Sequence, residues 1–291
     1  MKKTIIFFLL LSLIFGSCSK QYDGIIVPPM TEPQRVVDEM PAWSPDGNTI
    51  AYNHSGAVWL LDLKTMTKSF LTEGAIPVWS PDGSKIAFVK GNNIHIIDLA
   101  TKQITQLTNW FSCFFPSWSP DGKKIAFDVI TNWPSVPVDS AGIWVMNANG
   151  SNKRLVIKGR DPYYSPDGTQ FVYIGVPGSA TGSESQIWLA DTSGSNQTQL
   201  TNNSISNSDP IWSPNGSFIA WGSSGNNDNP GIWIMNADGT DQHLLIINGG
   251  YPTWSPDGKK IAFHMVDNSN RLIVLWVINS DGTGLQQLTE P

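Results

Sequence analysis

The pentapeptide Trp-Ser-Pro-Asp-Gly occurs four times, at residues 43–47, 79–83, 118–122 and 254–258. Two further copies carry one substitution each, Tyr164 for the tryptophan at 164–168 and Asn215 for the aspartate at 212–216. Neighbouring copies begin 36 to 48 residues apart. In this motif proline fixes the first corner of a tight turn, aspartate favours the second, and glycine adopts the positive φ that ends it. Each copy therefore predicts a hairpin between two strands.

Each copy is followed by the same series of short β-patterned runs. A run such as Ile86-Ala-Phe is followed by a run such as Ile143-Trp-Val-Met, then by a polar turn such as Asn236-Ala-Asp-Gly. The last run often ends in Leu-Thr, as at Leu107-Thr108. Four antiparallel strands in about 40 residues are typical of one propeller blade. The sequence predicts an all-β, six-bladed β-propeller, with four antiparallel strands per blade and blades starting near residues 41, 77, 116, 162, 210 and 252.

The six copies resemble the WD40-like (PD40) propeller repeat of the TolB family, in which each blade carries this hairpin and a terminal Leu-Thr. The resemblance runs from about residue 41 to 289, and it implies a role in a bacterial envelope assembly. TolB has an additional α/β domain where residues 18–40 precede the first blade here, so the partner interactions of that domain are not carried over. Leu285 to Thr289 supply a last strand, so closing the ring by strand exchange between the termini is not required.

The N-terminal residues have the pattern of an export signal. Lys2 and Lys3 precede an apolar run, and small residues lead to Cys18. The run is too short to span a membrane. Phe15-Gly16-Ser17-Cys18 resembles a bacterial lipoprotein signal, which implies cleavage after residue 17 and acylation of Cys18. We therefore expect a signal peptide at 1–17, a tether at 18–40 and the propeller at 41–291, anchored by lipid in the bacterial envelope, at the outer membrane. The alternative is an ordinary signal with an incidental cysteine.

Charge and cysteine content limit the partners. The formal net charge is −6, and it becomes −8 without residues 1–17, which hold two lysines and no acidic residue. Without a basic patch, nucleic acid is not an expected partner. Cys113 is the only cysteine after Cys18, so no disulfide is expected within the domain, and we expect this thiol to be buried and inert. The propeller is expected to be monomeric.

The binding surface is predicted from the aromatic residues that the repeat does not explain. Of thirteen tryptophans, only Trp110 and Trp133 have no repeat-dictated position. Strand alternation places both on the face that carries the long loops of blades three to five, and binding residues concentrate on such loops. The predicted contacts to an envelope protein or a glycan are Trp110, Phe111, Phe114, Trp133, Arg160, Asp161, Asp209, Asp228 and Tyr251. The alternative is that the aromatic link plugs a blade junction, with Phe115 packing inward.

Catalytic motifs are poor, and no enzyme activity, cofactor or metal is expected. No Gly-x-Ser-x-Gly element occurs. The enzyme alternative is a polysaccharide lyase or other hydrolytic or lyase enzyme, related to lyases that use similar propellers. Its site would be formed by His54 and His264, which end second strands of neighbouring blades, together with Asp128 on the same rim.

Overall fold

The computed structural model describes residues 37–110, 112–130, 140–175, 185–203, 205–224, 230–267 and 272–290. Val36–Pro291 forms one compact unit. The described residues contain twenty-four strands in six sheets, and each sheet contains four strands that follow one another in the chain and pair antiparallel. The predicted six-bladed β-propeller is confirmed. No helix long and apolar enough to cross a membrane occurs among the described residues.

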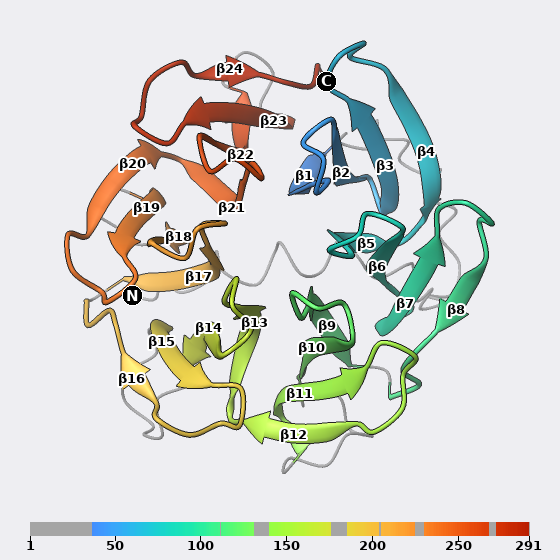
Figure 1. Cartoon of the computed structure of the whole chain (residues 1–291). Helices are drawn as coiled ribbons and strands as arrows, with labels where there is room; N and C mark the ends of the chain where they lie inside the picture. The colour runs from blue at the N-terminus through green and yellow to red at the C-terminus, as the bar shows by residue number, and fades with distance from the viewer. Residues whose placement is uncertain are drawn as a thin grey trace, which may run out of the picture. The chain divides into compact units, whose positions relative to one another are not determined.

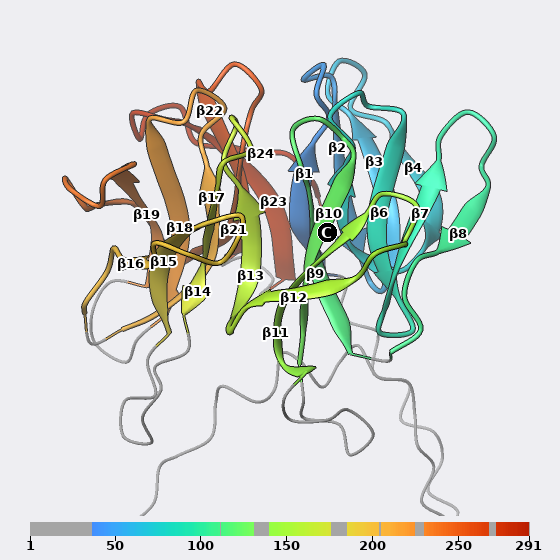
Figure 2. The same cartoon turned by 60° about the horizontal axis from the view of Figure 1, so that its bottom comes forward.

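The six blades are arranged in a ring around a central axis (Figure 1), and the strands run between the two faces of the ring (Figure 2). The innermost strands are β1 (Asp38–Trp43), β5 (Ala75–Trp79), β9 (Cys113–Trp118), β13 (Gly159–Tyr164), β17 (Ser206–Trp212) and β21 (Gly249–Trp254). The second strands are β2 (Thr49–His54), β6 (Lys85–Lys90), β10 (Lys124–Val129), β14 (Gln170–Gly175), β18 (Phe218–Ser224) and β22 (Lys260–Asp267). The third strands are β3 (Ala57–Asp62), β7 (Asn93–Asp98), β11 (Gly142–Asn147), β15 (Gln186–Asp191), β19 (Gly231–Asn236) and β23 (Leu272–Asn279). The outer strands are β4 (Lys68–Glu73), β8 (Ile104–Gln106), β12 (Arg154–Ile157), β16 (Thr198–Gln199), β20 (His243–Ile247) and β24 (Gln286–Gln287).

The repeated pentapeptide forms the turn between the first and second strands of each blade. In blade 1 the Ser44 hydroxyl donates to Oδ1 of Asp46 at 2.5 Å and accepts the Thr49 N–H at 2.9 Å. The same aspartate oxygen accepts the N–H of Asn48 at 3.1 Å. The motif thus satisfies its own backbone donors, as Asp and Ser side chains do in turns. Asn215 also provides a carbonyl Oδ1 for Ser213 at 2.8 Å, which explains the substitution in blade 5.

The Leu-Thr ending has a structural role in three blades. The hydroxyls of Thr108, Thr201 and Thr289 accept the backbone N–H of Ile94, Ile187 and Leu275 at 2.9, 2.9 and 3.0 Å. These blades have the short outer strands β8, β16 and β24. In blade 1, by contrast, β4 continues, and Thr72 pairs with Val58 through the backbone. In these three blades the threonine hydroxyl therefore accepts a backbone N–H of the third strand that the short outer strand does not pair.

The core lies in the six junctions between neighbouring blades. One buried cluster fills each junction, for example Ile50, Tyr52 and Leu61 of blade 1 with Ala262 and Leu275 of blade 6. The clusters combine apolar side chains of adjacent sheets, which hides the sheet faces from water. Stability of the ring therefore depends on contacts between blades as well as within them.

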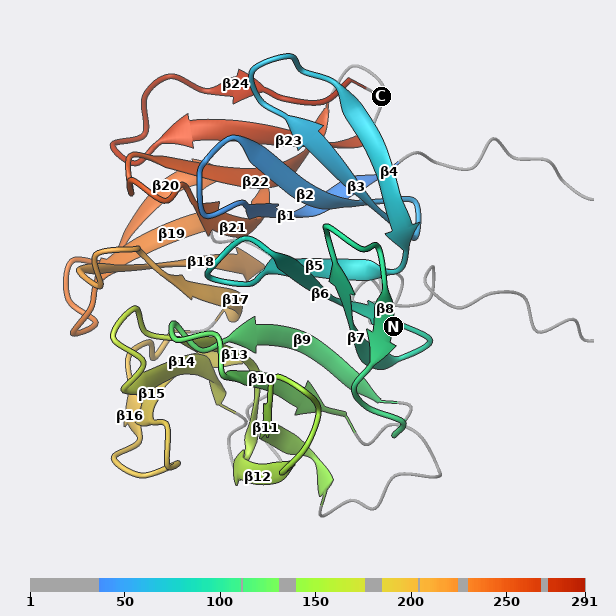
Figure 3. The same ribbon diagram turned by 45° about the vertical axis from the view of Figure 1, so that its right-hand side comes forward.

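Blades 1 and 6 meet as the other neighbours do (Figure 3). A methyl group built on Gly47 would lie 3.7 Å from Cδ of Pro256, and one built on Gly83 would lie 3.7 Å from Cδ of Pro45. All four strands of each sheet are consecutive in the chain, so the ring closes without strand exchange. The one isolated bridge among the described residues is parallel and joins Val37 to Ile273.

Candidate functional site: the central channel

Every innermost strand contains a β-bulge at the proline that precedes the pentapeptide. The residue before this proline has a left-handed backbone, with φ between 48° and 54° at Met40, Ile76, Phe115, Asp161, Asp209 and Tyr251. The pairing register shifts at the same point, for example between Arg160 and Tyr163. Proline has no N–H to pair, so a bulge accommodates it. Because a left-handed backbone is strained for residues other than glycine, six strained positions surround the channel.

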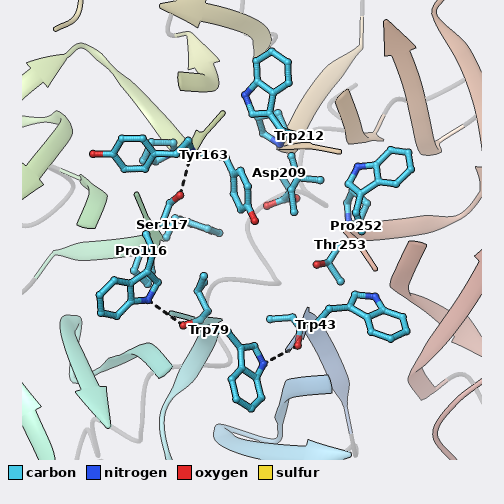
Figure 4. Close-up of a pocket in the computed structure, with 18 of the residues that line it drawn as sticks. Trp43, Trp79, Pro116, Ser117, Tyr163, Asp209, Trp212, Pro252 and Thr253 are labelled. Atoms are coloured by element: carbon cyan, nitrogen blue, oxygen red, sulfur yellow. Dashed lines mark hydrogen bonds between the residues drawn. The ribbon is translucent and has the colours of Figure 1, made fainter. Parts of the chain in front are cut away.

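These six residues line a cavity of about 350 Å³ to which all six innermost strands contribute (Figure 4). Blades 1, 2 and 3 contribute the apolar side chains of Met40, Ile76 and Phe115. Blades 4 and 5 contribute Asp161 and Asp209. Tyr251 completes the ring from blade 6. The channel therefore has an apolar half and a half with two carboxyl groups and a phenol.

Two residues further along each innermost strand, a second ring of side chains lines the cavity. Its members are Ala42, Val78, Ser117, Tyr163, Ile211 and Thr253. Tyr163 is the largest of them, and it packs against the clusters of the junctions on both sides of blade 5. Burial raises the pKa of its hydroxyl to about 12. Tyr163 therefore narrows the channel at this second ring, and its hydroxyl stays protonated at neutral pH.

A third carboxyl group lies next to the two in the channel. Asp128, on β10 of blade 3, is 0% exposed, and its Oδ2 accepts the backbone N–H of Asp161 at 3.4 Å. Its Oδ1 is buried and has no hydrogen-bond partner within the described residues. Burial, together with the Asp161 charge, raises the pKa of Asp128 well above its usual range. The protonated Asp128 shares a hydrogen bond with the Asp161 carboxyl, while its Oδ1 still lacks a donor among the described residues, which is costly for a buried acceptor.

Burial also raises the pKa of the two carboxyl groups that line the cavity. For Asp161 burial is the main cause, and the Arg160 guanidinium and a hydrogen bond with Asp128 oppose it. For Asp209 burial and the Asp161 charge raise the pKa to about 8, while a hydrogen bond from Ser208 opposes the shift. At neutral pH the group accordingly holds protons that an isolated aspartate would have lost.

Tyr251 and His264 form the blade 6 side of the channel. Their ring centroids are 5.0 Å apart. Burial raises the pKa of Tyr251 well above its usual value and lowers that of His264 to about 4. A methyl group built on Gly250 would lie 2.9 Å from Nε2 of His264, so glycine is needed for the imidazole to lie there. Both groups are uncharged at neutral pH.

Two of the six left-handed residues that line the channel directly follow an ionisable residue in the chain, Met40 after Glu39 and Asp161 after Arg160. Arg160 is exposed, and its Nη2 donates to the Ser185 hydroxyl at 3.0 Å. Glu39 accepts a hydrogen bond from Nδ2 of Asn53 at 2.9 Å, and burial raises its pKa. Neither belongs to the cavity lining.

The predicted aromatic contacts differ from the channel in their surroundings. Trp110 is half-buried, packs against the junction of blades 2 and 3, and meets Trp144 edge-on with ring centroids 4.8 Å apart. Lys153 Nζ lies 6.0 Å from its ring centroid. Phe114 packs against the same junction, as the plug alternative expects. Phe115, expected to pack inward, lines the channel.

Three predicted contact residues, Phe111, Trp133 and Asp228, lie outside the described residues, as do the signal peptide and Cys18. Asp161, Asp209 and Tyr251, predicted as rim contacts, are brought together in the channel wall. Cys113 is a free thiol with 0% exposure, and burial raises its pKa, so the expected buried position is confirmed.

The residues of the enzyme alternative have separate partners. Nδ1 of His54 lies 2.5 Å from Oδ1 of Asp38, Asp128 contacts Asp161, and His264 contacts Tyr251. In the strand register His54 faces Asp38, whereas His264 faces Gly250, so the two histidines occupy different positions in their blades. Among the described residues no three His, Cys, Asp or Glu side chains are arranged to hold a metal ion.

Sequence reasoning identified Asp161, Asp209 and Tyr251 but not what they share. The signal is the residue before the proline that recurs in each repeat: aligning the six repeats on Pro41 to Pro252 places Met, Ile, Phe, Asp, Asp and Tyr in one column. Asp128 is found the same way, because it directly follows the aromatic residue of its second strand, as His264 does.

Comparison with known proteins agrees with the fold. The TolB beta propeller domain family, PD40, matches residues 18–176 and 140–291. The chain belongs to this family. The Tol-Pal system protein TolB of Alcanivorax borkumensis (strain ATCC 700651 / DSM 11573 / NCIMB 13689 / SK2) is 36% identical over 81 residues, 26% of this chain and 18% of that protein. The uncharacterized peptidase YuxL of Bacillus subtilis (strain 168) is 31% identical over 111 residues, 36% of this chain and 17% of that protein. The chain spans less than half the length of the curated relatives it matches.

Solved structures share the fold of this TolB-type propeller at low sequence identity. TolB from Acinetobacter baumannii superposes with a TM-score of 0.67 and 20% identity, covering 87% of this chain and 63% of that one. An oligogalacturonate lyase from Vibrio parahaemolyticus gives 0.61 and 17%, covering 88% and 79%. At these identities the similarity establishes the propeller alone, because one fold hosts many functions.

Proposed function

We propose that this TolB-type propeller is a non-catalytic binding protein that receives a segment of a protein partner in its central channel. The observation that carries the proposal is the divided wall of the cavity, with Met40, Ile76 and Phe115 on one side and Asp161, Asp209 and Tyr251 on the other. A mostly apolar pocket with a few directed polar groups is typical of a binding site. Polypeptide segments offer apolar and polar side chains together.

The packing of Trp110 favours a polypeptide over a glycan. A tryptophan that binds sugar needs a free ring face. Trp110 meets Trp144 edge-on, lies 6.2 Å from the Phe127 ring centroid and has Lys153 near its face. Its surroundings are thus already protein. The channel, in contrast, has open volume and polar groups without a full set of partners.

For cellular location, we propose that the protein is exported and held at a bacterial envelope membrane by lipid on Cys18. The support is the basic, apolar and small-residue pattern before Cys18, together with the family, one member of which is the Tol-Pal system protein TolB. Labelling with radioactive palmitate and fractionation tests this. Wild type should carry label in the membrane fraction, and Cys18→Ser should carry none; label that persists in Cys18→Ser refutes the anchor.

The binding proposal is tested by a photo-cross-linker and two matched substitutions. p-Benzoylphenylalanine at position 115 should form a bond to a polypeptide from solubilised envelope, identified by mass spectrometry. Ile76→Asn places a polar group in the apolar half at a left-handed position that asparagine tolerates, and it should lower the cross-link yield at least tenfold. Ile104→Asn, on the exposed strand β8, is the control and should leave the yield unchanged. Equal yields in both variants, or no polypeptide adduct, would remove the channel as the binding site.

A further inference from the structure

The channel carries more carboxyl groups than its own residues neutralise. Asp128, Asp161 and Asp209 come from blades 3, 4 and 5, and they form a row in which each affects the next. Arg160 is the nearby cation, but it is exposed and donates to Ser185 outside the cavity lining. On the other sides the charged or titratable groups are Glu39, Tyr163, Tyr251 and His264, none of which supplies a positive charge at neutral pH.

Asp128 provides an independent indication of a missing donor. It is fully buried, its carboxyl is directed at Asp161, and its Oδ1 has no hydrogen-bond partner among the described residues. An unpartnered buried carboxyl oxygen is destabilising. A positively charged donor in the channel would pair directly with Asp161 and Asp209, which line the cavity, and its charge would lower the cost of ionising Asp128 behind them.

The opposite half of the channel limits what kind of cation fits. Met40, Ile76 and Phe115 offer apolar surface and no oxygen ligand from their side chains. A hydrated divalent ion needs six or more oxygen ligands around it, and the described residues contain no cluster of three metal-binding side chains. A cation on an alkyl stem satisfies both halves, with the stem on the apolar side and the head at the carboxyl groups.

We propose that the carboxyl row of Asp128, Asp161 and Asp209 is a subsite for an alkylammonium or guanidinium group, supplied by a lysine or arginine side chain of the bound partner segment. This inference rests on the proposed function, because the cation arrives on the segment that occupies the channel. Ion pairing requires ionised carboxyl groups, so binding of the cation expels the proton that Asp209 holds at neutral pH. Affinity for the cation therefore rises with pH.

The subsite is tested with n-butylammonium, which models the lysine side chain, and with n-butanol as its neutral counterpart. Titrations are followed by NMR of protein labelled with ¹³C at the aspartate carboxyl carbons. We expect butylammonium to shift the signals of Asp161 and Asp209 and to bind at least tenfold more tightly at pH 9 than at pH 6, since Asp209 ionises near pH 8. Butanol should show no pH dependence. Equal binding of the two probes, or signals that do not move, overturns the proposal.

Matched amide variants locate the effect. Asp209→Asn should weaken butylammonium binding at pH 9 at least tenfold, because it removes one carboxylate from the row. Asp241→Asn makes the same change of charge at an exposed turn residue, also with positive φ, and should stay within twofold of wild type. A circular dichroism spectrum like that of wild type is required of both. A uniform loss in the two variants would mean a general charge effect and would refute the subsite.

A second experiment distinguishes a cationic side chain of the partner from a free amine as the group that binds. It also tests this inference separately from the proposed function. The partner identified by cross-linking at position 115 is prepared again, with its lysines acetylated and its arginines blocked by phenylglyoxal. The modified partner is then cross-linked to the protein in the same way. A tenfold loss of cross-linking supports a partner side chain. Unchanged cross-linking leaves the binding function intact and refutes the cationic side chain, whereas binding of butylammonium without any protein adduct refutes the function and assigns the subsite to a free amine.

Discussion

The backbone N–H of Asp161 donates to Oδ2 of Asp128 at 3.4 Å, joining two neighbouring blades through a fully buried carboxyl group. Burial and the Asp161 charge raise the pKa of Asp128 above its unfolded value of about 3.9. Above that pH the unfolded chain has lost the proton while the folded chain keeps it. Folding stability from this group is therefore present at acid pH and is lost as pH rises through the folded pKa.

Asp128→Asn should remove this pH dependence. The amide keeps an acceptor for the Asp161 N–H and cannot ionise. We expect the variant to be more stable than wild type by about 1–3 kcal/mol at pH 8, because the raised pKa of Asp128 costs wild type about 1.4 kcal/mol for each unit above the unfolded value, and equal to wild type near pH 4. Urea unfolding at the two pH values measures this, with Asp241→Asn as the exposed control. Parallel stability curves for wild type and variant would contradict the raised pKa.

His264 should make the opposite contribution at acid pH. Burial lowers its pKa to about 4, whereas an unfolded histidine has about 6.5. As pH falls from 6.5 towards 4, the unfolded chain takes up a proton that the folded chain refuses, so stability is lost. Between pH 7 and 4 the free energy of unfolding of His264→Gln should fall by on the order of 1–3 kcal/mol less than that of wild type. His243→Gln, on an exposed outer strand, is the control, and its stability should follow the wild-type dependence on pH. If the stability of His264→Gln also follows it, the folded protein accepts the proton at His264.

The Leu-Thr endings yield a test of blade architecture. Thr201→Val keeps the shape of the side chain but removes the acceptor for the buried N–H of Ile187 and the donor to Oε1 of Gln186 at 2.8 Å, so we expect a loss of about 1–3 kcal/mol in the free energy of unfolding. Thr72→Val is the matched control, because the Thr72 hydroxyl only donates to the Glu73 carbonyl at 3.3 Å and β4 supplies the backbone partner. Chemical denaturation compares the two. Similar losses in both would mean that the hydroxyl has no special role in the short-strand blades.

The contrast between these blades shows how far the sequence reaches. The pentapeptide determines the fold because its serine, aspartate and glycine satisfy the turn locally, as in Ser44-Pro-Asp-Gly47, and such local chemistry repeats visibly along the chain. The channel is different. Its wall is assembled from one residue of each blade, up to 211 positions apart between Met40 and Tyr251, and no local pattern joins them. Only the closed ring places Asp161 beside Asp128.

Trp110 shows a second limit of the sequence. The repeat gives it no assigned position, which suggested an exposed contact residue, but junction packing is a property of two blades and leaves no mark within one repeat. In the structure its indole is half-buried against Trp144 and Phe127. An unexplained aromatic residue therefore has two interpretations, and they differ in what its removal changes.

Trp110→Ala separates these interpretations. If the indole seals the junction of blades 2 and 3, its loss should cost about 2–4 kcal/mol in the free energy of unfolding, somewhat below the cost for a fully buried tryptophan. Phe70→Ala, at a 58% exposed side chain on β4, is the control and should cost under about 1 kcal/mol. Cross-linking at position 115, measured at 10 °C on folded protein, should be unchanged, because the ring does not line the channel. The opposite result, normal stability with cross-linking lost, would make Trp110 a contact residue and move the binding surface from the channel to the link between the blades.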